Sequence, residues 1–366
     1  MVKGKKVIIA PDSFKGCLTA DEISHAVSLM IRREFSNIEP VEMPVADGGE
    51  GTVAALCRGM RRVRCEVRDP LMRIIEAEYA EDGCGTAYIE VAAASGLTLL
   101  DVAERNPLMT SSVGTGELVR HALARGNRVI VLGLGGSATN DGGTGLLSAL
   151  GVDFGVENPC GGSLLDIVRV DVSNLMPEAA EARFVLAVDV ESPFVGEGGA
   201  TRVFGPQKGA SADVVEFLER GMQHLASLLP VDIRYLRGAG AAGGIAGGLY
   251  SLLPCEITSG IDLVLDRGGF ADALIGADLV ITGEGSVDSQ SLMGKVLSGI
   301  LRRASLAGVP VVSLSGRVDE RERLLSAGLE DVVAVTPRSM SLDEALRKDV
   351  ALENILSAAH KICELL

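Results

Sequence analysis

The stretch K-V-I-I-A-P-D-S-F-K-G, residues 6–16, decides the fold, because an apolar strand runs directly into a loop of charged residues and glycine. The same arrangement recurs at residues 41–46 before D-G-G-E-G-T (47–52), 128–132 before G-L-G-G-S-A-T-N-D-G-G-T-G (133–145), 184–188 before Asp189, and 277–282 before G-E-G (283–285). In a parallel α/β sheet, ligands bind beyond the carboxyl ends of the strands. These loops are therefore expected to face one common site.

The composition of these loops indicates phosphoryl transfer. Glycine lets backbone N–H groups approach an anion closely, and carboxylates suit Mg²⁺ or a hydroxyl group. A Walker A loop, G-x-x-x-x-G-K-[ST], does not occur in the sequence, which excludes a P-loop kinase. Residues 133–138 with Asp153 match a dinucleotide fingerprint in spacing, but the following helix would carry N-D-G-G in its first turns. We therefore reject a nicotinamide site.

Length, charge and cysteine content narrow the class of protein. A chain of 366 residues is long enough for two domains, and its net charge of −15 argues against nucleic acid as a partner. The seven cysteines are scattered, and the apolar run near the amino terminus is too short for a signal peptide, so we expect a cytoplasmic protein.

The uncharged stretch 238–255 is mostly Gly and Ala, which favours a glycine-rich loop entering a packed helix over a membrane span.

The order of the expected elements changes twice along the chain. The first part is β-α-β-α, with strands at 5–10 and 40–46 and helices at 19–35 and 50–59. Alternating runs at 62–69, 73–81 and 86–92 then predict antiparallel strands. The βα rhythm returns with strands at 277–282, 310–315 and 331–336 and helices at 292–306, 320–327 and 341–364. We expect an α/β fold with a parallel-sheet lobe built from 1–66 and 268–366 and a mixed α/β domain, 67–267, inserted between them.

Two of the loops have a structural alternative. Asn140 and Asp141 could simply cap the helix that starts near Thr144, and Asp12 with Lys15 could form an ion pair in a surface turn. Phe14 weakens the second alternative, because a bulky apolar side chain needs a pocket. None of the four histidines lies in these loops, so histidine acid–base chemistry and a zinc site are not expected.

At these residues the sequence resembles the class I family of bacterial glycerate kinases. The matching stretches are A-P-D-S-F-K-G (10–16), P-V-A-D-G-G-E-G-T (44–52), L-G-G-S-A-T-N-D-G-G-T-G (134–145), V-F-G-P-Q-K-G-A (203–210), G-A-G-A-A-G-G (238–244), S-G-I-D-L-V-L-D (259–266), T-G-E-G (282–285), D-S-Q (288–290) and G-K (294–295). The resemblance implies phosphorylation of D-glycerate with ATP and Mg²⁺, favouring 2-phosphoglycerate over 3-phosphoglycerate. It also implies that the lobe built from both chain ends is flavodoxin-like.

The resemblance also suggests roles for individual residues. Asp189 is expected to orient or deprotonate the substrate hydroxyl, and Asp47 with Asp288 or Glu284 to lie near Mg²⁺. Lys15, Lys208 and Lys295 would neutralise the phosphates and the glycerate carboxylate. The remaining residues expected to bind substrate or nucleotide are Asp12, Ser13, Gly48, Gly49, Gly135, Gly136, Ser137, Asn140, Asp141 and Gln290.

Departures from the family pattern leave two alternatives open. Ser192 and Ser286 stand where the family usually has Asn and often has Arg. A kinase of the same fold acting on another small hydroxy acid is the nearer alternative, and a non-catalytic, metabolite-binding descendant is the farther one. A homodimer is also left open.

Overall fold

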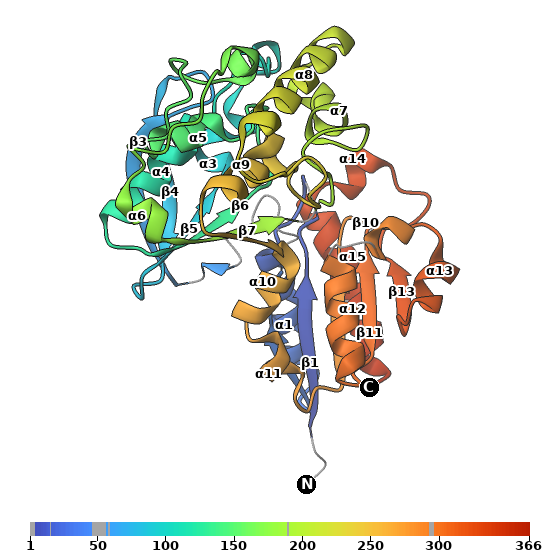
Figure 1. Cartoon of the computed structure of the whole chain (residues 1–366). Coiled ribbons are helices and arrows are strands. Elements are labelled where there is room, and N and C mark those ends of the chain that lie inside the picture. The colour runs from blue at the N-terminus through green and yellow to red at the C-terminus, as the bar shows by residue number, and fades with distance from the viewer. Residues whose placement is uncertain (1–3, 15, 46–55, 58, 189, 293–295) are drawn as a thin grey trace. The chain divides into compact units, whose positions relative to one another are not determined.

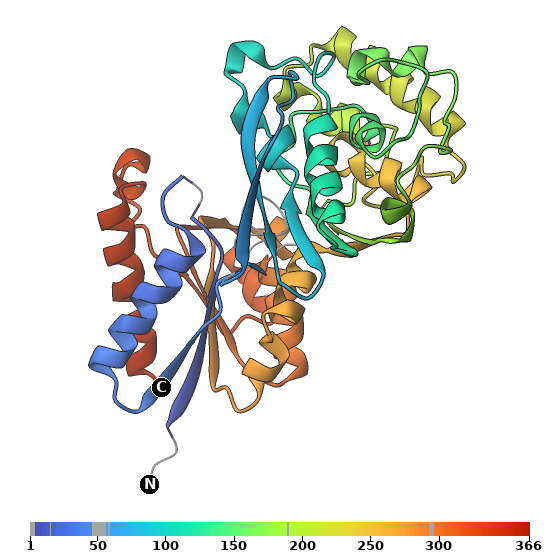
Figure 2. The same cartoon turned by 90° about the vertical axis from the view of Figure 1, so that its left-hand side faces the viewer.

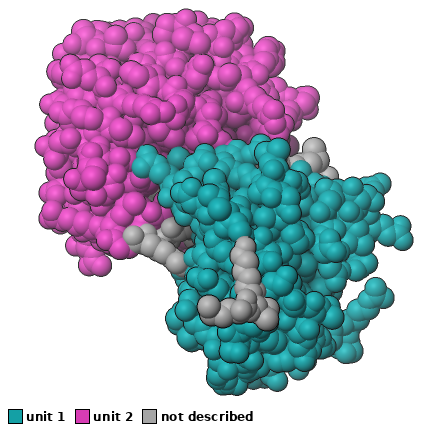
Figure 3. Space-filling view, turned by 90° about the horizontal axis from the view of Figure 1, so that it is seen from below, with its two compact units in different colours: residues 1–47, 261–366 teal, residues 48–260 magenta. Residues whose placement is uncertain are grey.

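The computed structural model of the chain describes residues 4–14, 16–45, 56–57, 59–188, 190–292 and 296–366. The chain divides into two compact units, residues 1–47 with 261–366 (unit 1) and residues 48–260 (unit 2), which Figure 3 shows in different colours. The boundaries expected from the sequence, near residues 67 and 268, lie further along the chain. That these parts also fold as separate domains stays a prediction.

Unit 1 contains a five-stranded parallel sheet in the order β13-β11-β9-β1-β2. Its strands are β1 (Lys5–Pro11), β2 (Ile38–Glu42), β9 (Leu279–Gly283), β11 (Val311–Ser315) and β13 (Asp331–Ala334). Numbered within the unit and read from the β2 edge, the order is 2-1-3-4-5, which is that of flavodoxin-like folds. The expected flavodoxin-like lobe is confirmed.

Helices cover both faces of this sheet. The helices of unit 1 are α1 (Ala20–Glu34), α10 (Gly260–Arg267), α11 (Phe270–Leu274), α12 (Val296–Leu306), α13 (Arg321–Ser326), α14 (Leu342–Ala345) and α15 (Lys348–Glu364). Helices α1 and α15 pack side by side on one face, and α10, α11 and α12 lie on the other (Figure 2). A short parallel pair, β10 (Ser286–Val287) with β12 (Arg317–Val318), and the 3-10 turn η6 (Ser289–Leu292) complete the unit.

Unit 2 contains a six-stranded mixed sheet in the order β3-β4-β5-β6-β7-β8 (Figure 1). Its strands are β3 (Arg61–Arg68), β4 (Ile74–Glu81), β5 (Thr86–Glu90), β6 (Val129–Gly133), β7 (Arg183–Val188) and β8 (Cys255–Ser259). The β3/β4 and β4/β5 pairs are antiparallel, as the alternating runs predicted, and the pairs from β5 to β8 are parallel. The carboxyl ends of the four neighbouring strands β5, β6, β7 and β8 therefore lie at one edge of this sheet, as does that of β3.

The helices of unit 2 contribute side chains such as Leu118, Leu146 and Leu249 to a hydrophobic core. They are α3 (Ala92–Ser95), α4 (Val113–Ala124), α5 (Thr144–Ala149), α6 (Pro177–Glu181), α7 (Ala200–Phe204), α8 (Ala212–Leu228) and α9 (Ile245–Leu252), with the 3-10 turns η1 (Leu97–Leu99), η2 (Val102–Glu104), η3 (Gly161–Asp166), η4 (Pro206–Lys208) and η5 (Ala241–Gly244). The glycine-rich stretch from 238 forms a loop that enters the packed helix α9, as expected. In the part of the chain that the structure describes, no helix has the length and apolar character of a membrane span.

Local signals explain where several elements begin and end. Thr19 and Glu22, the first and last residues of T-A-D-E (19–22), form a capping box at the start of α1. The strand expected over 40–46 is observed as β2, which starts at Ile38 and ends at Glu42. The chain still follows β1, since Val45 N donates to Pro11 O at 3.0 Å. The helix expected over 341–364 is interrupted at Arg347, whose backbone is extended, so that α14 and α15 are separate. The helix expected at 50–59 lies largely outside the described residues.

Candidate functional site

In unit 2 the loop after β6 is held against the rest of the unit by its backbone. Gly136 O accepts the N–H of Leu97 at 2.8 Å, and Ala138 N donates to Ser95 O at 2.8 Å. Within this segment the polar residues Ser137, Thr139 and Asn140 are buried, whereas Gly136 is exposed. Gly135 and Gly136, both expected to contact ligand, are thus the part of this loop that reaches solvent.

A second glycine-rich segment, residues 238–244, is hydrogen-bonded to the same loop. Gly142 N donates to Gly243 O at 3.0 Å. Gly243 has a φ of +67°, and a Cβ on it would lie 2.0 Å from Thr139 O, so only glycine fits there. Gly240 N in turn donates to Ser192 O at 2.9 Å. The stretch G-A-G-A-A-G-G therefore joins the loop after β6 to the loop after β7, where Ser192 contributes its backbone.

Lys208 is the one described lysine that reaches into this loop. Its side chain is 2% exposed, and its Nζ donates to Ser137 Oγ at 2.9 Å and to Thr139 O at 2.7 Å. Burial lowers the pKa of Lys208 to about 7, although the nearby Asp141 carboxylate opposes this change. The Lys208 amino group therefore links Ser137 and Thr139 of the loop, and a direct contact with phosphate stays a prediction.

Asp141 is directed into the protein interior. It is fully buried, and its carboxylate accepts hydrogen bonds from Ser112 N, Ser112 Oγ, Gly143 N and Gly145 N. Burial raises the pKa of Asp141, while these four hydrogen bonds act in the opposite direction. The arrangement favours the helix-capping alternative for Asp141, because Gly145 lies in the first turn of α5.

Asn140 has one polar atom paired and one unpaired. Its Nδ2 donates to Thr201 Oγ1 at 3.0 Å. Its Oδ1 is buried, as is the neighbouring Thr139 Oγ1, and neither atom has a hydrogen-bond partner among the residues that the structure describes. A buried oxygen without a donor is costly, so these two atoms mark the loop as incomplete without a further donor. Sequence reasoning missed Thr201 and Ser112, although the glycine-rich run G-E-G-G-A (196–200) directly before Thr201 was a usable signal.

In unit 1 the ends of β1 and β9 bring two carboxylates to one place. Pro11 pairs with Gly283 in register, and Asp12 N donates to Gly283 O at 2.8 Å. Asp12 and Glu284 each follow one of these paired residues. A Cβ on Gly283 would lie 1.7 Å from Leu314 O, so glycine is required where β9 passes the end of β11. Asp12 Oδ1 also accepts the N–H of Ser13 at 2.6 Å.

Asp12, Ser13 and Glu284 line one pocket of about 1140 Å³. The side chain of Phe14, which also lines it, belongs to the core of unit 1, so this loop is anchored as its bulk suggested. The other charged residues of the lining are Arg317, Asp319, Arg321 and Arg338. Sequence reasoning missed Arg317, although Gly316-Arg317 follows β11 in the same strand-then-glycine pattern as the other loops.

Ser286 lines this pocket, whereas Asp288 does not. Asp288 Oδ1 accepts the N–H of Ser291 at 3.2 Å and closes the turn η6, and Asp288 does not line the pocket. Ser286, one of the departures from the family pattern, does line it, opposite Arg317 in the β10/β12 pair. Gln290 lies in η6.

Several residues expected in the site lie outside the described residues, namely Lys15, Asp47, Gly48, Gly49, Asp189 and Lys295. Among the described residues, no group of three or more His, Cys, Asp and Glu side chains is placed to hold a metal ion. Mg²⁺ that arrives with a nucleotide needs only one or two protein carboxylates, because phosphate oxygens and water complete its coordination. Asp12 and Glu284 meet that requirement as donors.

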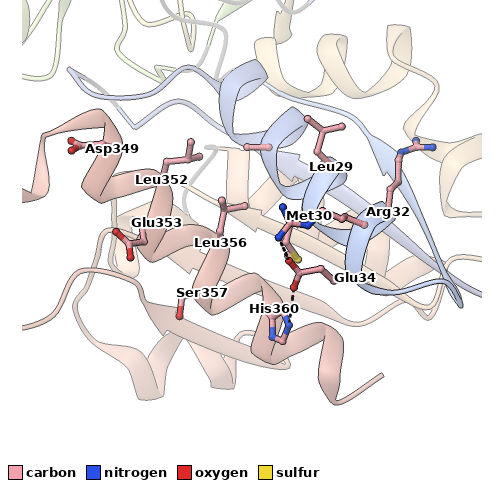
Figure 4. A pocket seen from close by; sticks show the side chains of 12 residues that line it. Leu29, Met30, Arg32, Glu34, Asp349, Leu352, Glu353, Leu356, Ser357 and His360 are labelled. Atoms are coloured by element: carbon pink, nitrogen blue, oxygen red, sulfur yellow. Dashed lines mark hydrogen bonds and ion pairs between the residues drawn. The ribbon is translucent and has the colours of Figure 1, made fainter.

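A second pocket of unit 1, about 1020 Å³, is a groove between α1 and α15 (Figure 4). Its lining includes Leu29, Leu352 and Leu356, together with His360, whose Nε2 lies 3.1 Å from Glu34 Oε2. All of its lining residues come from these two helices, and none comes from a strand end. It therefore lacks carboxylates at strand ends such as Asp12 and Glu284, which line the first pocket.

Comparisons with known proteins agree with one another. The model of the glycerate kinase family matches residues 7–366. The chain is 40% identical to a glycerate kinase of Haemophilus influenzae, over 99% of this chain and 98% of that protein. It is also 40% identical to a glycerate 2-kinase of Escherichia coli, over 98% and 97% of the two chains. A crystal structure from Salmonella typhimurium LT2, provisionally assigned as glycerate kinase 2, superposes with a TM-score of 0.85 at 39% identity, covering 99% of this chain and 98% of that one.

Proposed function

The chain belongs to the glycerate kinase family, and we propose that it transfers the γ-phosphoryl group of ATP to the 2-hydroxyl of D-glycerate. The products are 2-phosphoglycerate and ADP. The observation that carries the proposal is the family match over residues 7–366, which includes every glycine-rich loop quoted above. The position of transfer is supported by the Escherichia coli relative, which is a glycerate 2-kinase.

The reaction balances without a covalent enzyme intermediate. The substrate hydroxyl oxygen forms a bond to the γ-phosphorus, the bond from that phosphorus to the bridging oxygen breaks, and ADP leaves with the electron pair. The hydroxyl proton passes to a carboxylate, for which we propose Asp189 because it follows β7 directly. Catalysis of this kind depends mainly on positioning and on neutralising charge.

The chain offers groups for both tasks. Asp12 and Glu284 at the ends of β1 and β9 would hold Mg²⁺ together with Asp47, and the ion would supply charge neutralisation at the phosphates. Lys15 and Lys295 are proposed to contact phosphate or the glycerate carboxylate. Lys208 would act differently, because its buried Nζ fixes the loop of Ser137 and Thr139.

Three further features are proposed on chemical grounds. A cytoplasmic location is supported by the seven cysteines, all of which lie in the described ranges and are free. With a net charge of −15, the partners are small molecules, D-glycerate and ATP, and not nucleic acid. The homodimer stays an open prediction.

A panel of hydroxy acids tests the substrate assignment against the nearer alternative. Initial rates of ADP formation would be measured with ATP and Mg²⁺ and with D-glycerate, L-glycerate, D-lactate or glycolate. We expect kcat/KM for D-glycerate to exceed that for the others by about 100-fold or more, because D-lactate and glycolate lack the 3-hydroxyl that the site would bond, and L-glycerate presents its 2-hydroxyl in the opposite configuration. A higher kcat/KM for another acid would overturn the assignment. No turnover with any acid would support the non-catalytic alternative.

A further inference from the structure

The pocket of unit 1 that Asp12 and Glu284 line extends along the carboxyl edge of the sheet. Its lining includes residues that follow β1, β9, β11 and β13, in that spatial order, and continues onto α14. Neighbouring strands are spaced about 4.8 Å apart, so the four strand ends span about 14 Å. The pocket is therefore elongated, and its volume of about 1140 Å³ is far larger than a three-carbon acid requires.

The two ends of the pocket differ in chemistry. At the β1/β9 end lie the carboxylates of Asp12 and Glu284, at the point where the strand order reverses. At the β13 end lie Met340, Leu342 and Leu346, and Leu342 is 73% exposed. An exposed apolar wall of this kind is suited to a flat, largely apolar ring, whereas the acidic end is suited to a phosphate-bound cation.

Three arginines line the space between and beside these ends. Arg317 is paired with Asp319 at 2.8 Å, and Arg321 with Asp331 at 2.6 Å. Arg338 is exposed and makes no ion pair with any residue in the described part of the chain. In a protein of net charge −15, an unpaired arginine beside a pocket is well placed to attract an anion.

We propose that this pocket is the nucleoside triphosphate site, with the base against Met340, Leu342 and Leu346 and the phosphates extended toward Asp12 and Glu284. Arg338 contacts the nucleotide and takes no part in binding glycerate. This assignment rests on the proposed function, since it names the place in that reaction where ATP binds. The place of a ligand at the switch point of a flavodoxin-like sheet supports it.

Calorimetric titration with a non-hydrolysable ATP analogue and Mg²⁺ tests the assignment. Arg338→Ala and Leu342→Asp would be compared with the wild-type protein. The matched controls are Arg323→Ala and Leu306→Asp, which change exposed residues of unit 1 outside the pocket. We expect each pocket variant to raise the Kd of the analogue about 10-fold or more, the loss typical of a contact to a charged group or of a charge set against an apolar ring. The controls should remain within twofold.

Two further readouts keep the assignment open to contradiction. At saturating ATP, the KM for D-glycerate should stay within twofold in Arg338→Ala, and the melting temperature should be unchanged because Arg338 has no ion pair to lose. An analogue Kd within twofold of wild type in both pocket variants would overturn the assignment, as would a rise confined to the glycerate KM. A wild-type protein that forms no phosphoglycerate, yet loses analogue binding in these variants, would refute the proposed function and leave the nucleotide site standing.

Discussion

Lys208 Nζ donates a 2.9 Å hydrogen bond to Ser137 Oγ, from a turn that lies 71 residues further along the chain. Ser137 belongs to the loop after β6, and the same nitrogen also bonds to Thr139 O. A buried amine thus holds the shape of the loop in unit 2 that most resembles an anion-binding loop. We infer from these two bonds that Lys208 positions the loop after β6.

Lys208→Met should lower kcat about 100-fold, because a small displacement of a positioning loop has effects of that size. The change leaves two buried acceptors, Ser137 Oγ and Thr139 O, without their donor, so the free energy of unfolding should fall by about 1–3 kcal/mol. Steady-state kinetics measures the change in kcat, and chemical unfolding measures the change in stability. Lys348→Met, which removes an exposed ion pair with Glu22, is the matched control. A kcat within threefold of wild type would remove Lys208 from this role.

The stability of the protein should depend on pH through Lys208. Its pKa is lowered from 10.5 to about 7 in the folded state by burial. Between these values the unfolded chain binds the proton and the folded protein does not, so the free energy of unfolding rises with pH, by up to about 1.4 kcal/mol per pH unit. Urea unfolding at pH 7 and pH 9 measures the free energy of unfolding at each pH. The increase between the two should be smaller in Lys208→Met, because the contribution of Lys208 is then absent. Equal rises in both proteins would contradict the lowered pKa.

Asp189→Asn should lower kcat by about 10²–10⁴, the usual range for a positioned general base. The substitution keeps the shape of the side chain, so KM for both substrates should change little. Asp213→Asn, at the start of α8, serves as the control for loss of one carboxylate. If the Asp189 variant retained more than a third of the wild-type kcat, another group would have to accept the proton.

Gly283→Ala should destabilise unit 1. The added Cβ would lie 1.7 Å from Leu314 O, so β9 and β11 would have to move apart, and such overpacking costs about 1–3 kcal/mol. Chemical unfolding would measure the loss. Gly198→Ala is the control, because a Cβ there would meet Pro193 Cδ at 3.9 Å, an ordinary contact. Equal stability of the two variants would show that the strands can separate without cost.

Much of the fold could be predicted from the sequence, because its signals are local. Buried apolar runs gave the strands of unit 1, and Thr19 with Glu22 marked the start of α1. The same pattern recurs in S-L-D-E (341–344), where Ser341 Oγ accepts the N–H of Glu344 at the start of α14.

The site was less predictable, because its contacts join distant parts of the chain. The reach of Lys208 back to Thr139 depends on the packing of η4 against the loop after β6, which no local pattern encodes. The buried carboxylate of Asp141 likewise accepts a hydrogen bond from Ser112 Oγ, 29 residues away in the chain. Arg338 resembles any exposed arginine in the sequence, and only the sheet order places it at the same pocket as Asp12.

Phosphorus NMR of the product formed from ATP, Mg²⁺ and D-glycerate measures directly whether the 2-hydroxyl of glycerate receives the phosphoryl group. We expect ADP and one new phosphomonoester signal in equal amounts. That signal should be a doublet, because the phosphorus of 2-phosphoglycerate couples to a single proton on the adjacent carbon. A triplet would place the phosphate on the terminal CH₂ group, and inorganic phosphate without any phosphomonoester would contradict phosphoryl transfer to glycerate altogether.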